Sequence, residues 1–135
     1  MREASLLEPA KPAAAPRPAR TPPTLRPYQL EAVAAVEQLT KYQPQVATII
    51  EAATGIGKTV IASTVLQHRG PKGLILVHRD ELVRQTVSTL ERVMTDCFPG
   101  VVQAEDDEWD ADWVVASVQS LREKRLRRWH PGHFQ

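Results

Sequence analysis

Disulfide bonds within the chain are excluded by its cysteine content, because Cys97 is the single cysteine among 135 residues. A lone thiol is typical of a reducing compartment. The formal net charge is only +1, so no strong field over the whole molecule favours nucleic acid. No apolar stretch approaches the roughly 20 residues of a membrane-spanning helix, and the N-terminus lacks the apolar region of a secretory signal. We therefore expect a cytoplasmic protein without membrane contact.

The length allows one domain, and an apolar content of 42% is enough for a core. Residues 1–23 carry six prolines and six alanines and show no periodicity. Such a segment cannot bury enough surface to offset its ordering entropy, which predicts a disordered tail. Its scattered basic residues also allow a basic arm for nucleic acid, which composition favours less. The folded domain is expected over residues 24–135.

Helical and strand-like patterns alternate along that domain. Helices are predicted over residues 27–40, over 58–69 and from Asp80, and a short one from Val118. Strands are predicted over residues 46–50, 73–78 and 113–117, with a short one at 101–102. This alternation predicts an α/β protein with a parallel, doubly wound sheet and helices on both faces. Ligands of such sheets bind beyond the carboxyl ends of the strands.

The stretch from Glu51 to Thr59 lies between the predicted buried strand 46–50 and the helix 58–69. Glycines at 55 and 57 allow positive φ and close approach to a ligand, and the helix start adds its positive end. Lys58 would reach the β- and γ-phosphates, and the Thr59 hydroxyl would bind Mg²⁺. The strict P-loop pattern begins with glycine where Ala52 stands, so an ordinary glycine-rich turn with a surface lysine remains the alternative.

Two charged runs follow. Six carboxylates lie between Glu105 and Asp112, and we interpret them as a solvated loop rather than a metal site or a Walker B pair. A basic cluster over residues 122–128 is interpreted as a charged helix face, although phosphate contact is the other possibility. His130 and His133 lack the cysteine or carboxylate neighbours of a metal site, so no protein-held metal is predicted there.

Four blocks carry a family resemblance in their order along the chain. They are Leu-Arg-Pro-Tyr-Gln at residues 25–29, the P-loop at 52–59, Val-His-Arg-Asp-Glu-Leu-Val-Arg-Gln at 77–85, and Val-Val-Ala-Ser-Val-Gln-Ser-Leu at 114–121. Together they resemble the Q motif and motifs I, Ia and Ic of the first RecA-like lobe of superfamily 2 helicases. This is the group of DEAD/DEAH-box proteins and type III restriction subunits. That family commonly has alanine at the position of Ala52.

The resemblance implies that the chain binds ATP with Mg²⁺. Gln29 looks like the residue that reads adenine, since a carboxamide offers the donor and acceptor that match the N6/N7 edge. Arg26 and Tyr28 would shape the adenine pocket. The residues that would hold the phosphates and Mg²⁺ are Thr54, Gly55, Ile56, Gly57, Lys58 and Thr59.

Nucleic acid is the partner that the resemblance implies. Arg79, Ser117 and Gln119 look like contacts to the phosphate backbone, which carry no sequence information. The family often has threonine at the position of Ser117, and serine keeps the hydroxyl. The blocks at 25–29 and 77–82 differ from those of DEAD-box RNA helicases and look like the DNA repair and restriction branch. We therefore expect DNA rather than RNA.

The acidic box of motif II and the second RecA-like lobe, with its arginine finger, do not occur in these residues. The expectation is a partial helicase domain whose RecA-like sheet is incomplete at its C-terminal end. Such a chain should bind nucleotide without hydrolysing it, because ATP hydrolysis needs a held Mg²⁺, a positioned water and charge stabilisation. Two alternatives remain: another small P-loop enzyme such as a nucleotide kinase, and a non-catalytic fragment that binds nucleic acid or a partner.

Overall fold

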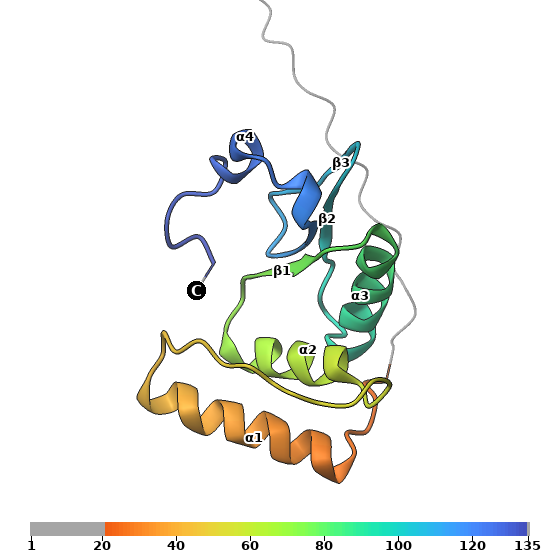
Figure 1. The fold of residues 1–135 in the computed structure, drawn as a ribbon, viewed down its shortest axis with the longest axis vertical. Helices are drawn as coiled ribbons and strands as arrows, with labels where there is room; N and C mark the ends of the chain where they lie inside the picture. Colours follow the sequence, from red (N-terminus) through yellow and green to blue (C-terminus); the bar gives the residue numbers. More distant parts are fainter. Residues whose placement is uncertain (1–20, 135) are drawn as a thin grey trace, which may run out of the picture.

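The computed structural model describes residues 21–134, so nearly all of the predicted disordered tail lies outside the described residues. In chain order the elements are α1 (Pro27–Tyr42), α2 (Lys58–Arg69), β1 (Gly73–Val77), α3 (Asp80–Val93), β2 (Gly100–Gln103), β3 (Asp106–Asp107), β4 (Trp113–Ser117), the 3-10 turn η1 (Val118–Ser120) and α4 (Glu123–Leu126). Figure 1 shows their arrangement. None of the helices in the described part of the chain is long and apolar enough to cross a membrane.

The sheet has the strand order β1-β4-β2-β3. The first three of these strands are parallel, and β3 adds a short antiparallel edge beside β2. Val77 of β1 pairs in register with Ser117 of β4, so the carboxyl ends of these two strands meet at one edge. This mostly parallel sheet, in which α3 connects β1 to β2, confirms the predicted α/β, partial RecA-like P-loop fold.

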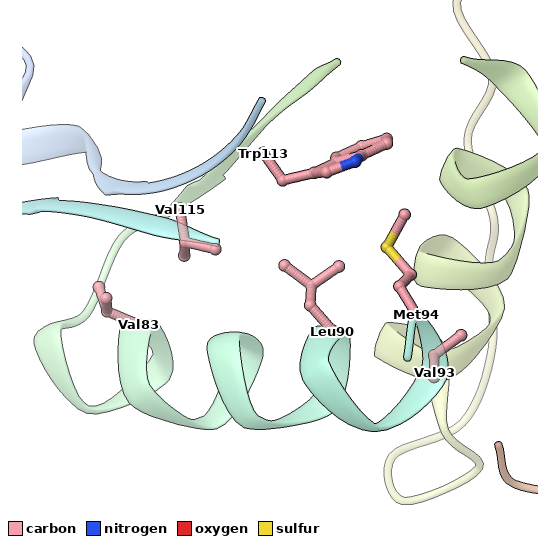
Figure 2. Packing of buried hydrophobic residues seen from close by; sticks show 6 residues of the cluster. All are labelled: Val83, Leu90, Val93, Met94, Trp113 and Val115. Atoms are coloured by element: carbon pink, nitrogen blue, oxygen red, sulfur yellow. The ribbon is translucent and has the colours of Figure 1, made fainter. Parts of the chain in front are cut away.

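Alternating residues of β4 divide the core between the two faces of the sheet, as the pleat requires. Val115 points toward α3 and packs with Val83 and Leu90 of that helix (Figure 2). Val114 and Ala116 belong to a second cluster on the other face, which Trp129 covers. In Figure 1, α4 lies on the opposite side of the sheet from α3. Both faces of β4 are therefore covered, and all five of its residues are buried.

The helices α1 and α2 pack against each other through a separate apolar cluster made by Val33, Val36, Ile61 and Val65. Polar contacts link the C-terminal end of α2 to α1 and to the loop that follows α1. Arg69 Nη2 donates to the Pro44 carbonyl at 2.6 Å, and His68 pairs with Glu37. These contacts hold α1 along the P-loop helix, which fixes the block at residues 25–29 relative to the P-loop.

The predicted strand at residues 46–50 is wrong. These residues form no regular structure, and Ile49 is 94% exposed. Backbone groups of a strand need a neighbouring strand as partner, and the four strands of residues 21–134 pair among themselves. Val46 and Ile50 are partly buried, and Ile50 packs against the α1–α2 cluster. An apolar, β-branched run is thus not sufficient for a strand when no ladder partner lies beside it.

The strand β1 was expected to be covered on both faces, and the structure shows less burial than that. It lies at the edge of the sheet, with β4 as its one partner. Gly73 is buried, but Leu76 is 52% exposed. Apolar edge strands with unpaired backbone groups favour association between chains, so this edge is the part of the described fold most exposed to aggregation.

Cys97 follows α3 and is half-buried beside the core. Burial, with smaller contributions from the carboxylates of Asp112 and Glu91, raises the pKa of its thiol from 9.0 to about 11. A pKa higher by about two lowers the reactive thiolate fraction by about a hundredfold near neutral pH. We expect iodoacetamide to alkylate the folded chain much more slowly than the same chain unfolded in urea. Equal rates in the two states would contradict this packing of Cys97.

Candidate nucleotide-binding site and nucleic-acid contacts

The P-loop reverses direction through two glycines in the left-handed region, Gly55 at φ 85° and Gly57 at φ 89°. An L side chain is strained in this region. At Gly57 a Cβ atom would also come within 2.6 Å of Gln29 Nε2, whereas nothing lies within 4 Å of one at Gly55. A glycine is therefore required at position 57 both for the left-handed conformation and because α1 lies so close. At Gly55 only the conformation favours glycine, since the space beside it is open.

Helix α2 begins directly after this turn, with Gly57 as its N-cap. Its first intrahelical bond is donated by Ile61 N to the Gly57 carbonyl at 3.1 Å. The N–H groups of Lys58, Thr59 and Val60 precede that bond and have no acceptor within the helix. Together with the positive end of the helix dipole, they form a site suited to an anion such as phosphate.

The Lys58 side chain folds over the loop. Its Nζ donates to the carbonyl of Ala52 at 2.6 Å and to that of Ala53 at 2.8 Å. Within residues 21–134, no carboxylate forms a salt bridge with the Lys58 ammonium group. The ammonium group is thus held by neutral carbonyl acceptors of the P-loop, which do not neutralise its charge.

Two donors from the block at residues 25–29 converge on one carbonyl of the P-loop, that of Ile56. Gln29 Nε2 donates to it at 2.9 Å and the Tyr28 hydroxyl at 3.1 Å. The Gln29 Oε1 atom accepts from the Arg26 backbone N–H at 2.9 Å, and Arg26 Nη1 lies 3.3 Å from the Tyr28 hydroxyl. Arg26, Tyr28 and Gln29 therefore brace the P-loop. Sequence reasoning placed them near the nucleotide but did not foresee this direct connection.

Gln29 is 7% exposed. Both ends of its carboxamide are engaged within the protein, which leaves one N–H of Nε2 for another acceptor. The side chain thus couples the start of α1 to the turn that would hold phosphate. Its predicted contact with adenine would use that remaining donor and the second lone pair of Oε1.

The three predicted nucleic-acid contacts lie at or just after the carboxyl ends of β1 and β4, which meet at the same edge of the sheet. Arg79 is the exposed N-cap of α3, and Gln119 is exposed in η1. Ser117 differs, because it is fully buried and its Oγ has no hydrogen-bond partner among the described residues. In Figure 1 the carboxyl end of β1 and the N-terminal end of α2 lie toward the same side of the molecule.

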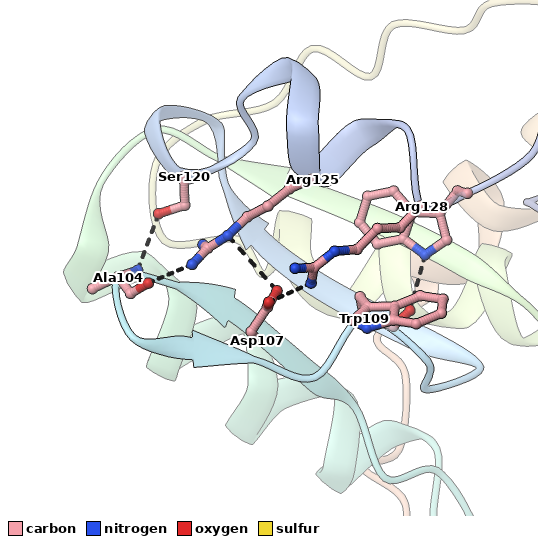
Figure 3. Close-up of polar contacts among 7 residues, drawn as sticks. Ala104, Asp107, Trp109, Ser120, Arg125 and Arg128 are labelled. Atoms are coloured by element: carbon pink, nitrogen blue, oxygen red, sulfur yellow. Dashed lines mark hydrogen bonds and ion pairs between the residues drawn. The ribbon is translucent and has the colours of Figure 1, made fainter.

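The acidic run was interpreted as a solvated loop and the basic cluster as a charged helix face. The structure shows that the two runs contact each other. Asp106 and Asp107 form β3, and the Asp107 carboxylate pairs with Arg125 and Arg128 of the basic cluster. Figure 3 shows this contact between the β2–β3 hairpin and the segment around α4. The sequence signal for this contact was an acidic run followed by a basic run of similar size. Because the two runs lie far apart along the chain, the sequence did not indicate which residues form ion pairs.

Fold and site together define a P-loop protein of the RecA-like class, with its glycine-bearing turn braced by Gln29. Comparison with protein families matches residues 23–134 to the family described as "Type III restriction enzyme, res subunit". The chain belongs to this family and corresponds to the N-terminal region of a superfamily 2 helicase.

A curated relative comes from Saccharomyces cerevisiae and is named "Putative ATP-dependent helicase IRC3". The two sequences are 36% identical over 121 residues. The match covers 80% of this chain and 17% of the yeast protein, so the chain spans less than a fifth of the length of this relative.

Proposed function

We propose that this chain is the nucleotide-binding part of an ATP-dependent helicase or translocase that acts on nucleic acid, DNA in preference to RNA. The observation that carries the proposal is the P-loop turn. It combines two left-handed glycines, a helix start with N–H groups free of intrahelical acceptors, and the ammonium group of Lys58. The family match and the name of the yeast relative support ATP as the nucleotide.

The proposed role of each residue in the P-loop and at the start of α2 follows from its chemistry. Backbone N–H groups at the start of α2 and Lys58 would bind the β- and γ-phosphates. The Thr59 hydroxyl, at the first turn of α2, would be a ligand of the Mg²⁺ that accompanies ATP, and the ion would neutralise phosphate charge. Among residues 21–134, no three His, Cys, Asp or Glu side chains are grouped so as to hold a metal ion by themselves. Thr54 and Gly55 would line the open side of the loop.

A titration with a fluorescent adenine nucleotide in the presence of Mg²⁺ tests the proposal. We expect weak, saturable binding that unlabelled ATP or ADP competes away. A fluorescent nucleotide that fails to bind the folded chain at any concentration would contradict it. A nucleotide kinase would instead need a second substrate, and phosphate transfer from ATP to a nucleoside monophosphate would support that alternative.

Nucleic acid would be bound through the backbone, with Arg79 and Gln119 as the exposed candidates. The burial of Ser117 means that its hydroxyl could take part only if the end of β4 opened. Contacts of this kind give affinity without sequence preference. We place DNA before RNA because the block at residues 77–82 differs from the corresponding one in DEAD-box RNA helicases.

Arg79→Ala should weaken binding to unrelated DNA sequences by about the same factor. The loss of one phosphate contact should also make the slope of log affinity against log salt shallower by about one. Fluorescence anisotropy with two duplexes of equal length measures both effects. Arg84→Ala, which removes an exposed arginine of the same helix, is the matched control. If it weakened binding as much as Arg79→Ala, the contact would be general charge attraction and not Arg79.

A further inference from the structure

The tip of the β2–β3 hairpin is attached to the η1 turn and to the segment that follows it. Ala104, at the tip, has a left-handed φ of 47°. Its N–H donates to Ser120 Oγ at 3.1 Å, and its carbonyl accepts from Arg125 Nη2 at 2.7 Å (Figure 3). Because Ser120 belongs to η1, this attachment places the Arg125 guanidinium next to the turn that presents Gln119.

The Asp107 carboxylate lies between two guanidinium groups. Arg128 Nη1 donates to Oδ2, and Arg125 Nε lies 3.7 Å from Oδ1. Oδ1 is buried and has no hydrogen-bond partner among the described residues. The three side chains are 24–33% exposed, so water screens the charges only partly. One negative charge thus faces two positive charges, and the group keeps a local excess of one positive charge.

Exposed charges of both signs lie nearby in the sequence, including the carboxylates of Glu105, Asp106 and Asp110. Arg127, the C-cap of α4, pairs with Glu123, and the nearby Arg122 and Lys124 are exposed. The Arg128 guanidinium also lies 5.9 Å from the centre of the Trp109 ring, which restricts its position. Two positioned guanidinium groups that converge on one oxyanion match the geometry in which arginine binds phosphate.

We propose that Arg125 and Arg128 form a second phosphodiester-binding site, which extends the path of the nucleic acid beyond Gln119, and that Asp107 is a built-in competitor for it. The inference rests on the proposed nucleic-acid binding. When a backbone phosphate approaches, it exchanges with the carboxylate at the two guanidinium groups. Asp107 therefore lowers the affinity of the chain for nucleic acid and keeps the two arginines in place when none is bound.

Asp107→Asn tests this directly, because it removes the charge and preserves the size of the side chain. We expect this variant to bind a short DNA duplex about tenfold more tightly at low salt. Its log–log salt slope should be steeper by about one. Asp107→Glu keeps the charge and should leave the affinity near that of the natural chain. Adding Arg128→Gln to Asp107→Asn should remove the gain.

Asp110→Asn is the matched control, since it removes one exposed carboxylate from the same acidic run. If it tightened binding as much as Asp107→Asn, general repulsion would explain the effect and the inference would fail. It would also fail if a folded Asp107→Asn variant bound DNA no more tightly than the natural chain. Binding that responds to Arg79→Ala but not to Asp107→Asn would overturn this inference alone. Absence of binding in every variant would overturn the proposed nucleic-acid function together with it.

Discussion

Lys58→Ala is expected to reduce the affinity for adenine nucleotide by about a hundredfold, close to the loss of measurable binding. The ammonium group would make charge-assisted hydrogen bonds to phosphate oxygens, and each such bond contributes about 1.5–3 kcal/mol. The backbone donors at the start of α2 remain in the variant but carry only partial charge. Titration with a fluorescent adenine nucleotide and competition by ATP measure the change.

The control for this experiment is Lys41→Ala. Lys41 lies in the last turn of α1, exposed and with its ammonium 5.9 Å from the centre of the Tyr42 ring. Removing it changes the net charge equally but leaves the P-loop intact. Circular dichroism must show that both variants are folded, because Lys58 also donates to the carbonyls of Ala52 and Ala53. If a folded Lys58→Ala variant bound nucleotide as tightly as the natural chain, the P-loop assignment would be wrong.

Leu90→Ala should lower the free energy of unfolding by about 2–5 kcal/mol. Leu90 is 0% exposed and packs in the cluster between α3 and β4 (Figure 2). The truncated side chain leaves a cavity in addition to the lost transfer free energy. Because native domains are stable by only about 5–15 kcal/mol, this single change could remove much of the total stability.

Urea denaturation followed by tryptophan fluorescence measures that loss, since Trp113 belongs to the same cluster. Leu30→Ala makes the same chemical change on a residue of α1 that is 54% exposed and should cost little. A Leu90→Ala variant with an unchanged denaturation midpoint would show that α3 is not packed on the sheet as described.

Much of the fold could be predicted from local pattern. The structure confirms a helix over Lys58–Arg69 and a strand over Trp113–Ser117 with the expected bounds. The P-loop glycines and the apolar run of β4 are strong local signals. The helix starting at Asp80 was also confirmed, because the apolar stripe of α3 repeats at helical spacing.

The prediction over residues 46–50 failed for a reason that no local pattern contains. A β-branched run has strand propensity, but strand formation also requires a partner with free backbone groups. Ile49 is exposed, so this residue is neither paired in the sheet nor buried in the core. In the same way, Leu30 and Leu39 lie within the helix predicted over residues 27–40 but are each 54% exposed, because α1 packs mainly on α2 and buries a narrow face.

Among the site residues, the sequence by itself determined the chemistry of the P-loop, since two glycines, Lys58 and Thr59 specify a turn and an anion-binding helix start through short-range geometry. The tertiary structure decided what lies beside that turn. It alone placed Tyr28 and Gln29 on the Ile56 carbonyl, buried Ser117 and brought Asp107 between Arg125 and Arg128. Such contacts join residues separated by about 20 or more positions along the chain. They depend on how the elements pack, and periodicity and spacing do not encode that packing.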